Sequence, residues 1–364
     1  MDREYGIDIL RIVSTIGVVV LHTFGIWYLK SSVYSGGGYN LIVNYNISAL
    51  LEIVFMCSVN VFGIITGYLY AGREKHSSYS IIKLLVAFVL YSALVTIGIK
   101  KIYPEAINGK VELIKNLFPF GVRLWYITAY FFVFFMIPYM NQFIRAIDKK
   151  TYLRFMCILA IMFCVLSEIR DFFGISTGYS CFWLIFCYFV GGYIKTYKIE
   201  LKKSISLLLF ASSCLVLFCL NVCTQIINIG FVDKIYGRLL AYTSPFIVIN
   251  SISIFLFFKT INVNNQHIRG ILKICSGSAL AVYIIHAHGL VLDNVFYPLM
   301  PSKLNDNPFY FLGFGLAVVI CVFLCGIIID IIRLKIEHLI KIDGIYKKIS
   351  EKLDSILLWN CEAK

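Results

Sequence analysis

The sequence predicts an all-α membrane protein with about ten transmembrane helices, on three observations. Hydrophobic residues make up 60% of the chain and charged residues only 15%, whereas about a quarter of a typical soluble domain is charged. Apolar runs long enough to cross roughly 30 Å of hydrocarbon recur along the whole sequence. Basic residues concentrate in alternate connections between these runs, which is typical of cytoplasmic loops.

Ten apolar segments are expected to cross the membrane. In chain order they are 7–29, 47–70, 81–99, 124–143, 152–169, 179–197, 204–223, 239–258, 275–295 and 309–332. The eighth segment is the weakest of these, because Tyr242, Ser244, Pro245 and Asn250 interrupt it. An even number of crossings places both termini on one side of the membrane.

The distribution of lysine and arginine predicts that both termini are cytoplasmic. On this orientation the basic side chains gather in the connections 71–80, 144–151, 198–203 and 259–274 and in the tail from Arg333. The outer connection 100–123 is an exception, because it is also basic. We therefore assign the net charge of +13 to orientation and to contact with anionic membrane lipids, and not to nucleic-acid binding.

Two units are expected. Residues 1–332 are predicted to form one integral membrane domain, and residues 333–364 a basic cytoplasmic tail. Apolar residues at helical spacing among lysines predict an amphipathic helix on the inner leaflet, with a plain solvated helix as the alternative. The first apolar segment is not read as a cleaved signal peptide, because it is too long and carries Asp8 and Arg11.

The cysteines do not predict a disulfide framework or a metal site. All of the twelve except Cys361 fall inside apolar segments, and none forms a CxxC pair. Buried cysteine behaves as a small apolar residue, so packing is the default interpretation. No histidine or carboxylate lies at a matching spacing, and we expect no bound metal.

Arg11 and His22 are the most informative polar residues, because both lie inside the first apolar segment, where charged groups are costly. They are eleven residues apart, close to three helical turns, so they share one helix face about 16 Å apart. Asp8 lies three residues before Arg11 on that face and can partly neutralise it. Taken singly, Arg11 could reach the inner lipid phosphates and His22 could be a core histidine bonded to the backbone.

Further candidates lie in later segments. Trp125 and Tyr126 stand at the outer edge of the fourth segment, where aromatic residues commonly anchor a helix at the membrane surface. His286 lies within the ninth segment and is a candidate for either a structural or a site role.

Several motifs resemble those of the acyltransferase-3 family of membrane O-acyltransferases. Asp8-Ile-Leu-Arg11, followed after ten residues by His22, is similar to the N-terminal signature of that family. The resemblance continues in the expected order through Val61–Tyr68, Arg123–Tyr126, the glycine pair Gly191-Gly192 and the run Ser278–His286. It covers nearly the whole chain, although the later motifs are individually weak.

The chain departs from the family pattern at four positions. Gly63 and Thr66 differ from the usual second-helix run, Arg123 stands where histidine is common, and Ala287 replaces the usual proline.

The resemblance implies transfer of an acyl group, usually acetyl, to a hydroxyl of a cell-surface or lipid-linked carbohydrate. Acetyl-CoA or another acyl-CoA would be a donor substrate and not a bound cofactor, and a bacterial cytoplasmic membrane is the expected location. Oligomeric state and an envelope-biosynthesis partner stay open, as does the acceptor glycan.

On this resemblance we assign expected roles to the candidate residues. Arg11, with Asp8, would bind a phosphate of the donor, and His22 would act as the general base. Trp125 and Tyr126 would stack on a sugar or on the donor, and His286 would bond in the same cavity. A covalent acyl-histidine intermediate is a second mechanistic option.

A transporter or flippase for a lipid-linked or anionic small molecule is the alternative from another class, because it too would carry Arg and His inside a helical bundle. Broken helices interrupted at mid-membrane would favour it, and the sequence shows no convincing pair.

Overall fold

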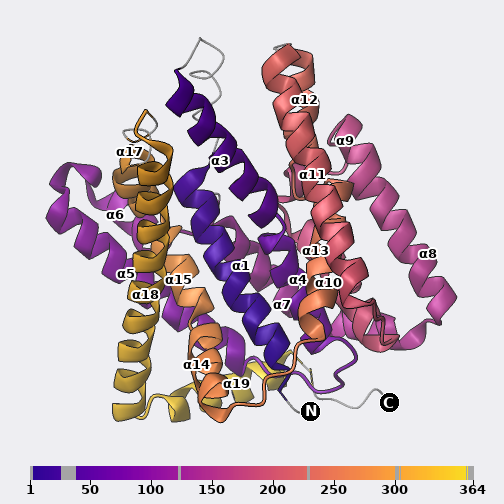
Figure 1. Cartoon of the computed structure of the whole chain (residues 1–364). Helices are drawn as coiled ribbons and strands as arrows, with labels where there is room; N and C mark the ends of the chain where they lie inside the picture. The colour runs from indigo at the N-terminus through magenta and orange to yellow at the C-terminus, as the bar shows by residue number, and fades with distance from the viewer. Residues whose placement is uncertain are drawn as a thin grey trace.

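The computed structural model describes residues 3–25, 38–121, 124–227, 230–299, 303, 305–357 and 359. Within these ranges the regular structure is entirely helical, as the apolar runs predict. Most of the long helices run roughly parallel to one axis and form a bundle (Figure 1). The all-α membrane fold class is thus confirmed.

The α-helices have the following bounds: α1 Tyr5–Phe24, α3 Tyr39–Phe55, α4 Ser58–Tyr70, α5 Tyr79–Ile102, α6 Lys110–Leu117, α7 Trp125–Ala146, α8 Lys149–Ala160, α9 Ser167–Ile169, α10 Cys181–Thr196, α11 Lys203–Ile227, α12 Gly230–Leu239, α13 Pro245–Lys259, α14 Gln266–Gly277, α15 Ala279–His286, α16 Gly289–Val291, α17 Tyr297–Leu299, α18 Pro308–Leu339 and α19 Asp343–Ile356. Single 3₁₀ turns occupy Pro104–Ala106 and Ser176–Gly178. The π-helical turns Ile161–Leu166 and Leu292–Phe296 join α8 to α9 and α16 to α17.

Eight helical segments in the described part of the chain are long and apolar enough to cross a membrane. Helices also occupy the other two predicted spans, but α10 has only 16 residues and α13 only 15. A straight crossing needs about 20 residues, so the predicted count of ten stays a prediction. Helix α13 begins at Pro245, where the sequence interrupts the apolar run, because proline lacks the amide hydrogen of a helix interior.

The predicted segment 275–295 is not one helix, which corrects the sequence interpretation. Helix α15 ends at His286, and His288 is the N-cap residue of the short helix α16, which begins at Gly289. The side chain of His288 explains the break: its Nδ1 accepts from the backbone amide of Leu290 at 3.3 Å, and its Nε2 donates to the carbonyl of Asn116 at 3.0 Å. The imidazole thereby caps the start of α16 and binds a carbonyl near the end of the distant helix α6.

The first two predicted spans also differ in detail. Helix α1 ends at Phe24, and the rest of the predicted segment 7–29 lies beyond Gly25, largely outside the described residues. The second predicted span, 47–70, begins earlier than predicted, at Tyr39. It is divided into α3 and α4 at Met56 and Cys57.

Glycines set the closest helix contact of the bundle, between α4 and α10. A Cβ atom on Gly67 would lie 1.9 Å from the carbonyl oxygen of Tyr188, and one on Gly191 would lie 2.0 Å from that of Ile64. Small residues let helix backbones approach each other in a membrane, where dispersion contacts replace the hydrophobic effect. The glycines of the Val61–Tyr68 and Gly191-Gly192 motifs therefore have a direct packing role.

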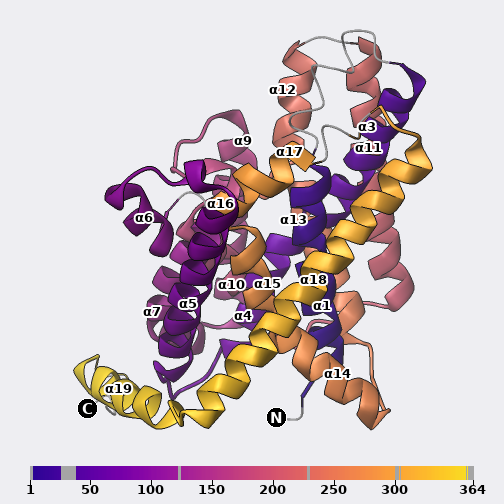
Figure 2. The ribbon, with the colours of Figure 1, turned by 90° about the vertical axis from the view of Figure 1, so that its left-hand side faces the viewer.

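The start of α1 and helix α19 lie at the same end of the bundle (Figures 1 and 2). Helix α18 continues to Leu339, past the predicted boundary at residue 332, and Lys341 with φ of 53° turns the chain into α19. Helix α19 runs across this end of the bundle (Figure 2). Which side of the membrane this end faces, and whether the tail is a separate unit, stay predictions.

The connection between α4 and α5 holds α19 in place. Asp354 accepts from the backbone amide of Ser78 at 2.8 Å, and the Ser78 hydroxyl donates to Ser350 at 3.2 Å. His76 is buried beside Trp359, with ring centroids 5.8 Å apart. Burial, with the nearby Arg73 as a smaller cause, lowers the pKa of His76 from 6.5 to about 4.

We expect Gly67→Ala or Gly191→Ala to destabilise the protein by about 3 kcal/mol or more, because the added methyl meets backbone atoms that cannot move independently. Gly313→Ala in α18 is the matched control, since a Cβ there meets nothing within 4 Å. Thermal unfolding of the purified variants measures the difference. Equal melting temperatures for all three variants would contradict the assigned packing role.

The protein should lose stability as the pH falls from about 6.5 towards 4, partly through His76. The folded state keeps His76 neutral while the unfolded chain binds a proton, so acid favours unfolding. We expect Tm to fall more between about pH 7.5 and pH 5 for the wild type than for His76→Gln. An identical fall in both proteins would show that His76 does not contribute.

Candidate functional site

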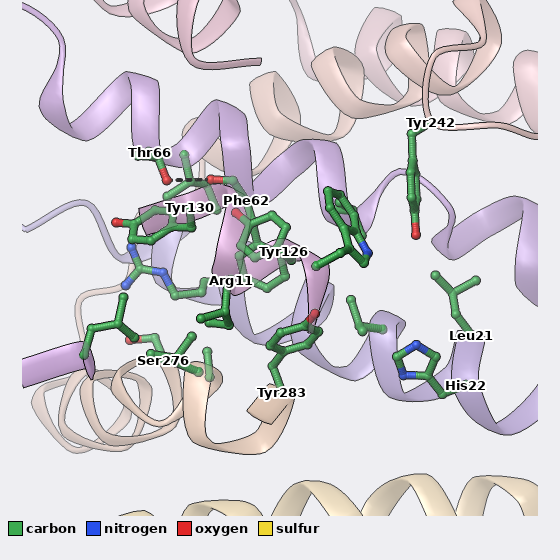
Figure 3. A pocket seen from close by; sticks show the side chains of 18 of the residues that line it. Arg11, Leu21, His22, Phe62, Thr66, Tyr126, Tyr130, Tyr242, Ser276 and Tyr283 are labelled. Carbon is green, nitrogen blue, oxygen red and sulfur yellow. Dashed lines mark hydrogen bonds between the residues drawn. The ribbon is translucent and has the colours of Figure 1, made fainter. Parts of the chain in front are cut away.

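A cavity of about 790 Å³ lies inside the bundle. Side chains from α1, α3, α4, α5, α7, α14 and α15 line it, together with residues that precede α10 and α13. In Figure 3, Arg11 and His22 lie at opposite ends of the row of labelled side chains, with Tyr126 and Tyr283 between them. The elongated cavity therefore connects the two residues that the sequence singles out.

One face of α1 forms the floor of this cavity. Arg11, Val18 and His22 all line it, at spacings of seven and four residues. These spacings return to the same side of an α-helix, so the predicted shared face of Arg11 and His22 is present. Gly17 lets α1 approach the α3–α4 junction, because a Cβ there would lie 2.4 Å from the Ser58 hydroxyl.

At one end of the cavity, Arg11 lies beside Tyr130 and Ser276 (Figure 3). The expected pairing of Arg11 with Asp8 is present but long, at 3.9 Å. Asp8 binds Arg3 more closely, at 2.6 Å, and accepts from Ser276 at 3.0 Å. Asp8 is buried and does not line the cavity. It therefore acts on this end of the cavity through its ion pair with Arg11.

At the other end, His22 forms a hydrogen-bonded pair with His286. Nδ1 of His286 lies 2.6 Å from the carbonyl oxygen of Val282, which can only accept, so this nitrogen carries a hydrogen. Nε2 of His286 is then an acceptor, and Nδ1 of His22, 3.0 Å away, donates to it. This chain of bonds leaves Nε2 of His22 with a free lone pair.

His286 is held rigidly behind His22. It is only 1% exposed and lies on the last turn of α15, whose Val282 contacts α18. A Cβ on Gly326 of α18 would lie 2.9 Å from the Cα of Val282, so the two helices touch through their backbones. Helix α18 therefore fixes the carbonyl that sets the protonation pattern of both histidines.

Aromatic side chains form much of the cavity wall. Trp125 contacts Tyr179, with ring centroids 4.9 Å apart, and Tyr179 contacts Tyr242 at 5.0 Å. Tyr126 extends the wall from Trp125 towards the middle of the cavity, where it lies 6.0 Å from the ring of Tyr283. Both predicted aromatic residues, Trp125 and Tyr126, line the cavity.

Two buried contacts hold Tyr242 in this wall. Asn60 of α4 donates to the Tyr242 carbonyl at 2.9 Å and accepts from the indole of Trp183 at 2.7 Å. Gly178 packs directly on Tyr242, because a Cβ there would lie 2.5 Å from the Cβ of Tyr242. The φ of Gly178, +102°, also favours glycine. A glycine at this position therefore lets the turn before α10 pack closely against Tyr242.

The structure thus brings together most of the residues predicted for the site. Arg11, His22, Trp125 and Tyr126 line one cavity, whereas His286 acts on it through His22. Arg123 of the same motif as Trp125 lies outside the described residues.

The sequence interpretation did not assign a further set of cavity residues to the site. Tyr283 belongs to the Ser278–His286 motif, but no motif marks the others, and no signal separates the remaining lining tyrosines from the other tyrosines of the chain. The main members of this set are Glu52, Tyr70, Tyr130, Tyr179, Tyr242, Ser276 and Tyr283.

An imidazole and a guanidinium that share one internal cavity of a helical membrane bundle mark a functional site. A family model described as "Acyltransferase domain", that of the acyltransferase-3 family, matches residues 4–326. The chain belongs to this family and is a membrane acyltransferase. No curated protein matches the chain, and no solved structure does.

Proposed function

We propose that this protein transfers an acyl group, most simply acetyl, from acyl-CoA to a hydroxyl of a cell-surface or lipid-linked carbohydrate. The observation that carries the proposal is the pairing of His22 with His286, at the end of the cavity opposite Arg11. The pairing orients an unprotonated Nε2 for proton removal, and the cavity gives room for a long substrate. Membership of the acyltransferase-3 family supports the same reaction class.

In the proposed reaction, Nε2 of His22 takes the proton of the acceptor hydroxyl as its oxygen attacks the thioester carbonyl. The new C–O bond forms, the C–S bond breaks, and the thiolate of CoA leaves and takes up the proton. His286 acts as a positioning residue, because its acceptor nitrogen fixes the ring orientation of His22 and stabilises the imidazolium that forms.

Arg11 suits the anionic part of the donor. Its guanidinium is permanently charged and can bond a phosphate through two parallel N–H groups. The distance of about 16 Å along α1 from Arg11 to His22 is of the order of an extended pantetheine arm. A donor bound by its phosphates near Arg11 would therefore present its thioester near His22.

A carrier for a lipid-linked or anionic molecule is the second candidate, and one observation favours it. Helices are interrupted beside the cavity at Met56-Cys57 and at Ser278, in contrast to the unbroken spans predicted from sequence. Transfer leaves a covalent change on the acceptor, whereas transport does not.

His22→Ala should lower acyl transfer by roughly 10²–10⁴, because the general base is lost. Proton NMR of surface glycans detects O-acetyl signals from cells that contain the intact chain, the variant at matched membrane level, or neither. His286→Ala should retain more activity than His22→Ala, since it alters only the orientation of the base. Equal O-acetyl signals from the intact chain and His22→Ala would remove His22 from the mechanism.

Arg11→Gln should raise the KM for acetyl-CoA about 10- to 100-fold, because a charged hydrogen-bonding group is lost. Arg11→Lys should recover only part of the affinity for acetyl-CoA, since a lysine cannot bind a phosphate with two parallel hydrogen bonds. Arg170→Gln is the control, because Arg170 is exposed and does not line the cavity. An unchanged KM in Arg11→Gln would exclude the donor-binding role.

A further inference from the structure

The connection 100–123, which departs from the predicted charge pattern, contains four exposed lysines that the rest of the bundle does not use. They are Lys100 and Lys101 at the end of α5, and Lys110 and Lys115 on α6. Within the part of the chain that the structure describes, none of these four side chains forms a hydrogen bond or an ion pair. Their charges are therefore available to a partner outside the chain.

Helix α6 lies at the membrane face opposite α19. Helix α5 begins beside α19, where the rings of Tyr79 and Tyr346 are 6.5 Å apart. It is long and apolar enough to cross the membrane, α6 follows its far end, and α7 is the next candidate span. Both views show α6 at the edge of the bundle, so that membrane lipids can reach it (Figures 1 and 2).

One face of α6 is fixed against the bundle. Leu113 packs on a buried apolar cluster that includes Leu290. Near the end of the helix, the carbonyl of Asn116 accepts hydrogen bonds from the hydroxyl of Thr96 and from Nε2 of His288, both at 3.0 Å. These contacts determine which face of α6 points away from the protein.

The opposite face of α6 is apolar and has a lysine on each border. Val111 is 68% exposed, Ile114 59%, and Phe118, just after the helix, 50%. At 100° per residue, two lysines enclose the apolar positions of the helix within an arc of about 140°. We call this surface the outward face; it consists of Lys110, Val111, Ile114, Lys115 and Phe118.

An outward face of this kind fits the boundary between acyl chains and headgroups. Water would leave its large apolar side chains unburied, and the hydrocarbon centre would leave its two ammonium groups without a partner. In the interface, the apolar side chains enter the acyl region while the lysines reach the headgroup phosphates.

We propose that the outward face of α6 docks on anionic phospholipids of the membrane. Charge complementarity selects this class of lipid, because each lysine near an anionic surface contributes roughly a fivefold gain in affinity. The two lysines at the end of α5 add to the same attraction. A second copy of the chain fits less well, since a symmetric contact through this face would bring like charges together.

The docking surface lies outside the cavity, and the inference does not depend on the proposed acyl transfer. It nevertheless bears on the site, because the Asn116 carbonyl holds His288, two residues after His286. Lipid bound to the outward face would therefore steady the segment that follows the histidine pair.

The test uses hydrogen–deuterium exchange of the full chain in nanodiscs of phosphatidylcholine alone or of phosphatidylcholine mixed with phosphatidylglycerol. We expect the amides of α6 to exchange about tenfold or more slowly in the mixture, because the helix must leave the lipid surface before it opens. High salt should reduce this difference between the lipids, since it screens exposed charges.

Substitutions separate lipid docking from folding. The pair Lys110→Gln and Lys115→Gln should remove most of the difference between the two lipids. The pair Lys202→Gln and Lys203→Gln removes the same charge from exposed residues at the start of α11 and should keep the difference. Ile114→Ser should speed the exchange of α6 in the mixture, whereas Ile114→Leu should match the wild type.

Two kinds of result would overturn the proposal. One is equal exchange of α6 in both lipids, or a full difference that persists without Lys110 and Lys115. The other is protection that disappears when each nanodisc holds a single chain, which would assign the outward face to contact with a second copy.

Discussion

A polar group inside a membrane must find its partner within the protein, and this constraint explains how the bundle around α1 is built. Asp8 and His22 find partners on later segments or in the N-terminal extension, whereas Arg11 pairs with Asp8 one turn earlier on α1. Partners can come close only where helices carry small residues. Glycines at the contacts of α1 with α3, of α4 with α10 and of α15 with α18 supply that closeness.

The two ends of the cavity satisfy the constraint in different ways. At the Arg11 end, charges pair directly, and Asp8 is shared between two arginines and a serine. At the His22 end there is no ion pair among the described residues that bond the histidines. A row of neutral hydrogen bonds runs from His22 through His286 to the Val282 carbonyl. The paired charges at the Arg11 end suit the binding of an anionic group. The neutral hydrogen bonds at the His22 end suit the transfer of a proton.

The sequence predicted the fold class and the position of most helices well, because apolar length and composition are local properties. It also predicted that Arg11 and His22 share a face, which follows from helical periodicity alone. It did not predict the break at His288, since the carbonyl of Asn116 that binds its imidazole belongs to α6, far away in the chain. The contact of His22 with His286 is likewise tertiary, and Glu52 carried no motif to mark it.

The guanidinium of Arg11 has a consequence for the membrane as an electrical barrier. A water-filled cavity inside a membrane protein shortens the path that a small ion must take through hydrocarbon, and ion leakage would dissipate the membrane potential. A small cation that entered this cavity would meet the positive charge of Arg11, which repels it, as in pores where an arginine excludes cations. A charge that suits an anionic substrate would therefore also help the membrane to stay insulating.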